Sequence, residues 1–119
     1  MGILEKRRKM RESVIRKSLE WVSSLPFKLT AILIGSYARG DFNLWSDVDI
    51  LLISREFKGN PVERLMSIDF PAGFQVIPLT EKEFKILLKR REPLILEAKE
   101  KGVILRDDLK LFSKDSNEN

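Results

Sequence analysis

The sequence contains no cysteine and no histidine among its 119 residues. Without them the chain has no thiolate nucleophile and no serine–histidine or cysteine–histidine catalytic pair. Zinc fingers and haem sites held by histidine are excluded for the same reason. Any bound metal must be held by oxygen ligands, which favours Mg²⁺, Mn²⁺ or Ca²⁺.

Long apolar runs are missing as well. No stretch of about 18 apolar residues is present, as a membrane-spanning helix would need, and the opening MGILEKRRKMRES lacks the apolar core of a signal peptide. We therefore expect a cytoplasmic protein that does not associate with membranes. The length allows one domain, and hydrophobic residues, at 43% of the chain, are sufficient for its core.

Hydrophobic periodicity divides the chain into helices and strands. Helices are predicted over residues 3–24, 62–68, 81–91 and 93–101. Strands are predicted over residues 29–34, 48–54, 74–79 and 103–105. This order predicts an α/β or α+β fold, in which helices cover a small mixed β-sheet. We expect residues 1–27 to form an N-terminal amphipathic helix of the same domain, 28–106 the domain proper and 107–119 a polar C-terminal tail.

Three local signals refine this prediction. The run VDILLIS over 48–54 is almost continuously apolar, which suits a strand buried on both faces. Pro78 favours either an edge position for the strand that contains it or the end of that strand. Thr80 and Glu83 have the spacing of a capping box at the start of a helix.

The segment between the first two strands carries the residues that can do chemistry. The first strand ends at Gly35-Ser36, and Asp47-Val48-Asp49 opens the second strand ten residues later. Strand side chains alternate between faces, so Asp47 and Asp49 point the same way, with their Cα atoms about 6–7 Å apart. They can hold a divalent cation, which would relieve their mutual repulsion. At the Gly-Ser turn, backbone N–H groups, the Ser36 hydroxyl and Arg39 can bind phosphate oxygens.

Each feature alone has a plainer explanation. A Gly-Ser pair after a strand is usually a turn, an Asp-x-Asp pair at a strand is more often solvated charge, and a single arginine is often surface charge. The joint order is more informative, because each part supplies one component of a site for a metal ion and a triphosphate.

In the order of these motifs, the sequence resembles the nucleotidyltransferase superfamily related to DNA polymerase β. It resembles the minimal nucleotidyltransferases of archaea and bacteria more closely. The family signature is Gly-Ser, about ten residues, then Asp-x-Asp. The longer signature of small members, G-S-x-A-R-G-(x)₅-S-D-x-D, matches residues 35–40 and 46–49. The resemblance covers about residues 28–105.

The resemblance implies a polymerase β-like nucleotidyltransferase fold and a Mg²⁺- or Mn²⁺-dependent reaction. A nucleoside triphosphate such as ATP would transfer its nucleotidyl group to an acceptor and release pyrophosphate. Asp47 and Asp49 would be the catalytic, metal-binding residues. Gly35, Ser36 and Arg39 would bind the nucleotide.

The sequence departs from the family at the third acidic position, which lies on the next core strand. The residue there is Gln75, whose neutral amide can donate an oxygen to a metal but cannot act as a base at neutral pH. Asp69 and Glu81 are near in sequence, but neither occupies the expected strand position.

Two other functions compete with the enzyme. The chain could be a catalytically weakened, nucleotide-binding or antitoxin-like interaction module that lacks the third carboxylate. It could also be an RNA-binding accessory domain that uses its basic first helix, although we favour a solvated face there. Trp45, Tyr37 and Phe42 could stack on a base, anchor the loop or contact a partner. The resemblance implies a HEPN-type helical partner protein, and a homo-oligomer is the alternative.

Overall fold

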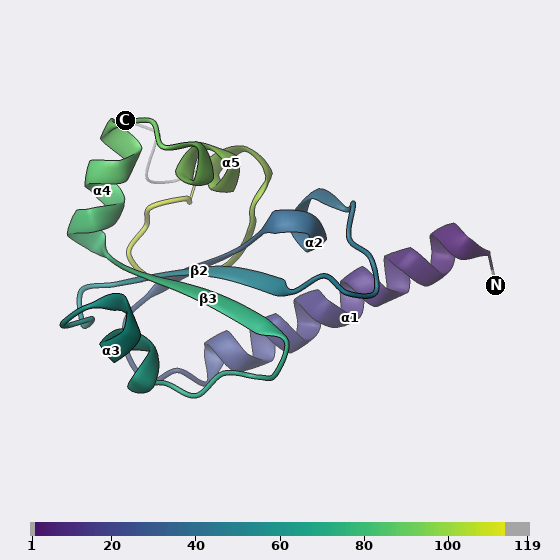
Figure 1. Cartoon of the computed structure of the whole chain (residues 1–119), viewed down its shortest axis with the longest axis horizontal. Coiled ribbons are helices and arrows are strands. Elements are labelled where there is room, and N and C mark those ends of the chain that lie inside the picture. Colours follow the sequence, from purple (N-terminus) through teal and green to yellow (C-terminus); the bar gives the residue numbers. More distant parts are fainter. Residues whose placement is uncertain (1, 114–119) are drawn as a thin grey trace.

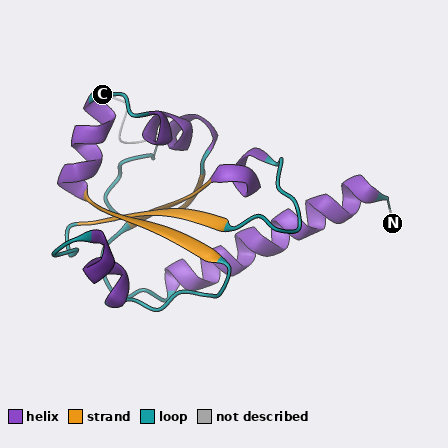
Figure 2. Cartoon of the chain, in the orientation of Figure 1, coloured by secondary structure: helices purple, strands orange, loops and turns teal. Residues whose placement is uncertain are grey.

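The computed structural model describes residues 2–113. Its elements follow the alternation expected from the sequence (Figure 1, Figure 2). In chain order they are α1 (Ile3–Ser23), β1 (Thr30–Ile34), α2 (Gly35–Arg39), β2 (Val48–Ser54), α3 (Pro61–Met66), β3 (Phe74–Thr80), α4 (Glu81–Lys89), α5 (Pro93–Lys101) and β4 (Val103–Asp107).

The strands form one four-stranded mixed sheet in the order β3-β2-β1-β4. β1 pairs antiparallel with β2 and with β4, and β2 pairs parallel with β3. The α+β fold with a small mixed sheet is therefore confirmed. β3 lies at an edge of the sheet, one of the two positions that Pro78 favours, because proline has no N–H to donate to a neighbouring strand.

Helices cover both faces of this sheet (Figure 1). Along β2, Val48, Ile50 and Leu52 belong to the core beneath α1. The alternate residues Leu51 and Ile53 belong to the second core, beneath α4 and α5. This alternation explains the continuous apolar run of the strand, because both of its faces are buried.

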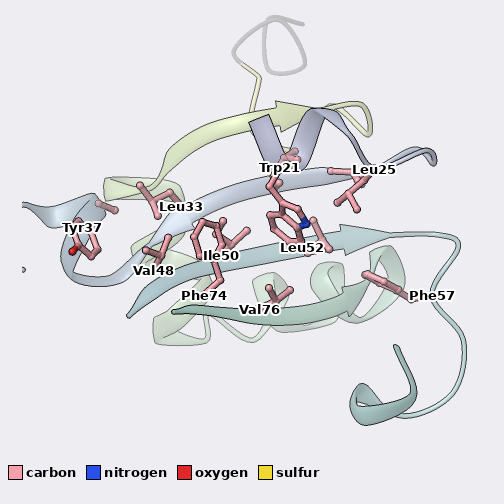
Figure 3. Close-up of a cluster of buried hydrophobic side chains, with 14 of the residues drawn as sticks. Trp21, Leu25, Leu33, Tyr37, Val48, Ile50, Leu52, Phe57, Phe74 and Val76 are labelled. Atoms are coloured by element: carbon pink, nitrogen blue, oxygen red, sulfur yellow. The ribbon is translucent and has the colours of Figure 1, made fainter. Parts of the chain in front are cut away.

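The core on the α1 side is closed by Trp21 (Figure 3). Its ring packs edge-on against Phe74, with 5.8 Å between the ring centroids. Its indole N–H donates to the carbonyl of Asp69 at 2.7 Å. Only the C-terminal part of α1 is buried in this way, at Ser18, Trp21 and Val22. The N-terminal part of the helix passes the loop between α2 and β2 instead (Figure 1).

The predicted capping box begins α4. The Thr80 hydroxyl accepts from the Glu83 N–H, and the Glu83 carboxylate accepts from the Thr80 N–H. The same carboxylate pairs with the buried Arg64 guanidinium at 2.6 Å. Arg64 in turn donates to the carbonyl of Pro78 at 3.1 Å, so α3, the edge strand and α4 are tied at one point.

The segment after β4 packs against the domain. Leu109 and Phe112 are buried in the core beneath α4 and α5. The Asp107 carboxylate accepts from the Thr30 hydroxyl and from three consecutive backbone N–H groups, those of residues 111–113. Residues 114–119 of the expected polar tail lie outside the described residues. Between residues 2 and 113, no helix has the length and apolar character that a bilayer crossing requires.

Candidate functional site

The Gly-Ser pair lies at the junction between β1 and the short helix α2. Gly35 has a φ of 75°, a left-handed conformation that glycine adopts without steric cost. Ser36 follows and is half-buried. α2 ends at Gly40, whose φ is 98° and whose N–H donates to the carbonyl of Ser36 at 2.8 Å. Glycine therefore fixes the chain direction at both ends of this turn of helix.

Asp49 lies directly against Gly35. It is the second residue of β2, in register with Ile34 on β1 and with Gln75 on β3. A Cβ atom at position 35 would overlap the Asp49 carboxylate. Any residue other than glycine at position 35 would therefore displace that carboxylate. The antiparallel pairing of β1 with β2 brings the Gly-Ser motif into contact with the Asp-x-Asp motif.

The two aspartates differ in exposure. Asp47 is exposed just before β2, whereas Asp49 is half-buried. Burial raises the pKa of the Asp49 carboxyl, and the neighbouring negative charge of Asp47 raises it further. The structure therefore places the Asp49 carboxylate against the Gly-Ser turn at one end of β2, with Asp47 close enough for its charge to act on Asp49.

Arg39, the last residue of α2, lies in the same charged cluster. Its guanidinium pairs with Asp41 at 3.2 Å and with Glu97 of α5 at 2.7 Å. Its positive charge lowers the pKa of Asp49, while the charge of Glu97 raises it. A hollow of about 290 Å³ lies between Arg39 and α5.

Comparison with known proteins shows the family of the chain. The family model of the nucleotidyltransferase domain matches residues 12–115. The chain belongs to this family. A solved structure from Sulfolobus solfataricus, described as a candidate nucleotidyltransferase, is 26% identical, with a TM-score of 0.53. The match covers 85% of this chain and 83% of that one. No curated protein matches the sequence at a significant level.

In this nucleotidyltransferase domain, Gln75 stands beside Asp49 in the parallel register of β2 and β3. Paired residues of adjacent strands share a face of the sheet, so Gln75 lies on the same face as Asp49, where the resemblance predicts the third ligand. It is exposed, and with Asp47 it lines a hollow of about 540 Å³ at the edge of the sheet.

The two other candidates for a third carboxylate lie elsewhere. Glu81 follows β3 at its far end and pairs with Arg55 and Lys85. Asp69 belongs to the loop before β3, where its carbonyl accepts from Trp21. Between residues 2 and 113, no group of three or more acidic side chains is arranged to hold a metal ion.

Sequence reasoning missed Glu97. Its interaction with Arg39 spans 58 residues of sequence, and nothing in the helical pattern of α5 marks it.

The three aromatic residues singled out in the sequence differ in their exposure. Tyr37 and Phe42 are buried and stacked, with 4.4 Å between their ring centroids. Trp45 is 89% exposed on the loop before Asp47 and is accessible to a ligand or a partner.

Proposed function

We propose that this nucleotidyltransferase domain is an enzyme that binds a nucleoside triphosphate with Mg²⁺ and transfers its nucleotidyl group to a protein or small-molecule acceptor. The observation that carries the proposal is the contact between Gly35 and the Asp49 carboxylate. This contact supports the proposal because backbone N–H groups at such a turn can bind phosphate and a carboxylate can bind a cation.

The residues at this position fit a magnesium ion. Mg²⁺ is usually bound through one or two carboxylates together with waters and substrate phosphates, so a complete protein cage is not needed. Asp47 and Asp49 supply those carboxylates. Burial and mutual repulsion raise the pKa of Asp49, and a cation would offset both effects. Bound there, the ion would neutralise charge on the reacting phosphates.

The chain's own groups would orient the triphosphate. The Ser36 hydroxyl can donate one hydrogen bond to a phosphate oxygen. Arg39 offers a planar set of donors that matches phosphate geometry, and its present partners Asp41 and Glu97 are partly exposed, so phosphate can exchange with them. Positioning of the phosphates is a main requirement of phosphoryl-type transfer, and Ser36 and Arg39 would supply it.

A second function is favoured by Gln75. Its amide cannot accept the proton of an acceptor hydroxyl at neutral pH. Gln75 pairs with Asp49 in the strand register, where the resemblance predicts a carboxylate. A weakened, nucleotide-binding or antitoxin-like module would retain Asp47, Asp49 and the Gly-Ser turn without efficient transfer. Its partner would be a HEPN-type helical protein or a second copy of the chain, and the exposed Trp45 offers a contact for either.

Incubation with labelled ATP, CTP, GTP and UTP in cell extract separates the two functions. We expect label from the α-phosphate to enter an acceptor in the presence of Mg²⁺, and not with the Asp47→Asn/Asp49→Asn variant. Nucleotide binding without any labelled acceptor would favour the weakened module. Equal labelling by the double variant would contradict the site assignment.

A further inference from the structure

We propose that Arg7 and Arg11 of α1 are positioning residues for the nucleotide site. They would hold the segment of residues 35–42 in the position relative to Asp49 that nucleotide binding requires, without touching the nucleotide. This inference rests on the proposed function, because it assumes that Ser36 and Arg39 bind phosphate.

The two arginines donate to the backbone at the end of α2. Arg11 donates from Nε to the carbonyl of Tyr37 at 2.6 Å and from Nη2 to that of Ala38 at 2.9 Å. Arg7 donates from Nη2 to the carbonyls of Gly40 and Phe42, each at 2.9 Å. The last carbonyls of a helix have no partner within it. Here the Arg11 guanidinium supplies partners for two such carbonyls of α2 from a separate helix, and Arg7 binds the backbone just beyond the end of α2.

An aromatic stack strengthens the same attachment. The guanidinium of Arg7 lies over the Phe42 ring, 4.3 Å from its centroid. Phe42 stacks on Tyr37 with an angle of 17° between the ring planes. Both rings are buried. The backbone from residue 37 to residue 42 is therefore fixed by hydrogen bonds and by packing on its α1 side.

The opposite side of the segment meets the candidate metal ligands. Gly35 contacts the Asp49 carboxylate, so the segment lies between α1 and β2. If the arginines were lost, α2 could tilt, and Ser36 and Arg39 would move relative to Asp49. Misplacement of a binding group by about 1 Å is enough to cost much of its effect in a site of this kind.

This placement also reinterprets the basic character of α1. Arg7 and Arg11 are part-buried and turned toward the domain, whereas Arg8 is exposed. Arg8 makes no hydrogen bond or ion pair within residues 2–113. Arg8 and Arg11 carry the same charge on the same helix, and only Arg11 holds the α2 backbone. Comparing substitutions at Arg8 and Arg11 therefore distinguishes positioning of the backbone from long-range attraction of an anionic nucleotide.

The experiment measures the affinity for ATP with Mg²⁺ by calorimetry, with the melting temperature of each variant as a control for folding. We expect Arg8→Ala to remain within about twofold of wild type, since exposed charges are screened by salt. We expect Arg11→Ala to bind about tenfold more weakly. Arg11→Lys should fall between the two, because lysine restores the charge but not the paired donors.

A double-mutant cycle with Ser36→Ala distinguishes positioning from general destabilisation. If Arg11 acts through the segment that carries Ser36, the combined loss of affinity will be smaller than the product of the two single losses. Independent, multiplicative losses would overturn the inference. Equal affinity of Arg11→Ala and Arg8→Ala would also overturn it while leaving the proposed function intact. Failure of the wild type to bind any of the four nucleotides would overturn the proposed function itself.

Discussion

Replacing Gly35 by alanine tests whether the Gly-Ser turn and Asp49 form one site. The new Cβ would overlap the Asp49 carboxylate, which must then move. The variant would also force alanine into a left-handed conformation at a φ of 75°. We expect the backbone strain to lower the stability of the protein, and the displacement of the carboxylate to lower its affinity for the nucleotide.

Gly73 provides a matched control for the first of these effects. Its φ is 83°, close to that of Gly35, but a Cβ there would meet no atom within 4 Å. A left-handed conformation costs an L-residue about 1–2 kcal/mol. For a domain of this size, each kcal/mol lowers the melting temperature by about 4 °C. Both variants should therefore melt about 4–8 °C below wild type.

Calorimetry with ATP and Mg²⁺ then separates the two variants. Gly73→Ala should keep the wild-type affinity, while Gly35→Ala should lose roughly 10- to 100-fold, the usual cost of disturbing the orientation of a metal ligand. If both variants bind ATP equally well, the contact between Gly35 and Asp49 has no part in nucleotide binding, and the proposed site is refuted.

Two further predictions concern Gln75 and Glu83. Gln75→Asp should lower the stability of the metal-free protein, because the new carboxylate repels Asp49. Mn²⁺ should then raise the melting temperature of this variant by more than it raises that of wild type. If a Mn²⁺ titration gives the same shift for both proteins, Gln75 is not at a ligand position. Hydrogen bonds from the Arg64 guanidinium and from the Thr80 N–H lower the pKa of Glu83 from 4.5 to about 2. A depressed carboxyl pKa stabilises the fold above pH 4.5, and this stability is lost as the pH falls toward 2. The free energy of unfolding of Glu83→Gln should therefore decline less over that range, as denaturant titrations at several pH values would measure, and an unchanged decline would contradict the assigned pairing.

Local signals in the sequence are sufficient for most of the fold. The apolar run over 48–54 predicts a strand buried on both faces, and β2 is one. The Thr80–Glu83 spacing predicts a helix start, and α4 begins there. These predictions succeed because periodicity and capping depend on residues close in sequence. The burial of Leu109 and Phe112 is different, because it depends on how a mostly polar segment folds back over α5.

The charged cluster is only partly predictable for the same reason. Motif spacing alone predicts that the Gly-Ser turn and the two aspartates lie together. It cannot indicate that Glu97 meets Arg39, because that ion pair depends on where the fold places α5 relative to α2. Nor can composition show that Arg7 and Arg11 turn inward, because a basic helix has the same sequence whether its arginines contact solvent or backbone carbonyls.

The central claim is that Asp47 and Asp49, beside the Gly-Ser turn, bind a nucleoside triphosphate through a divalent cation. Its most direct test is calorimetric titration of ATP, CTP, GTP and UTP into the protein with Mg²⁺ and with a chelator, in parallel with the Asp47→Asn/Asp49→Asn variant. We predict binding of at least one nucleotide by the wild type with Mg²⁺ only, and no binding by the variant. Equal affinity with and without Mg²⁺, or equal affinity in the variant, would contradict the claim.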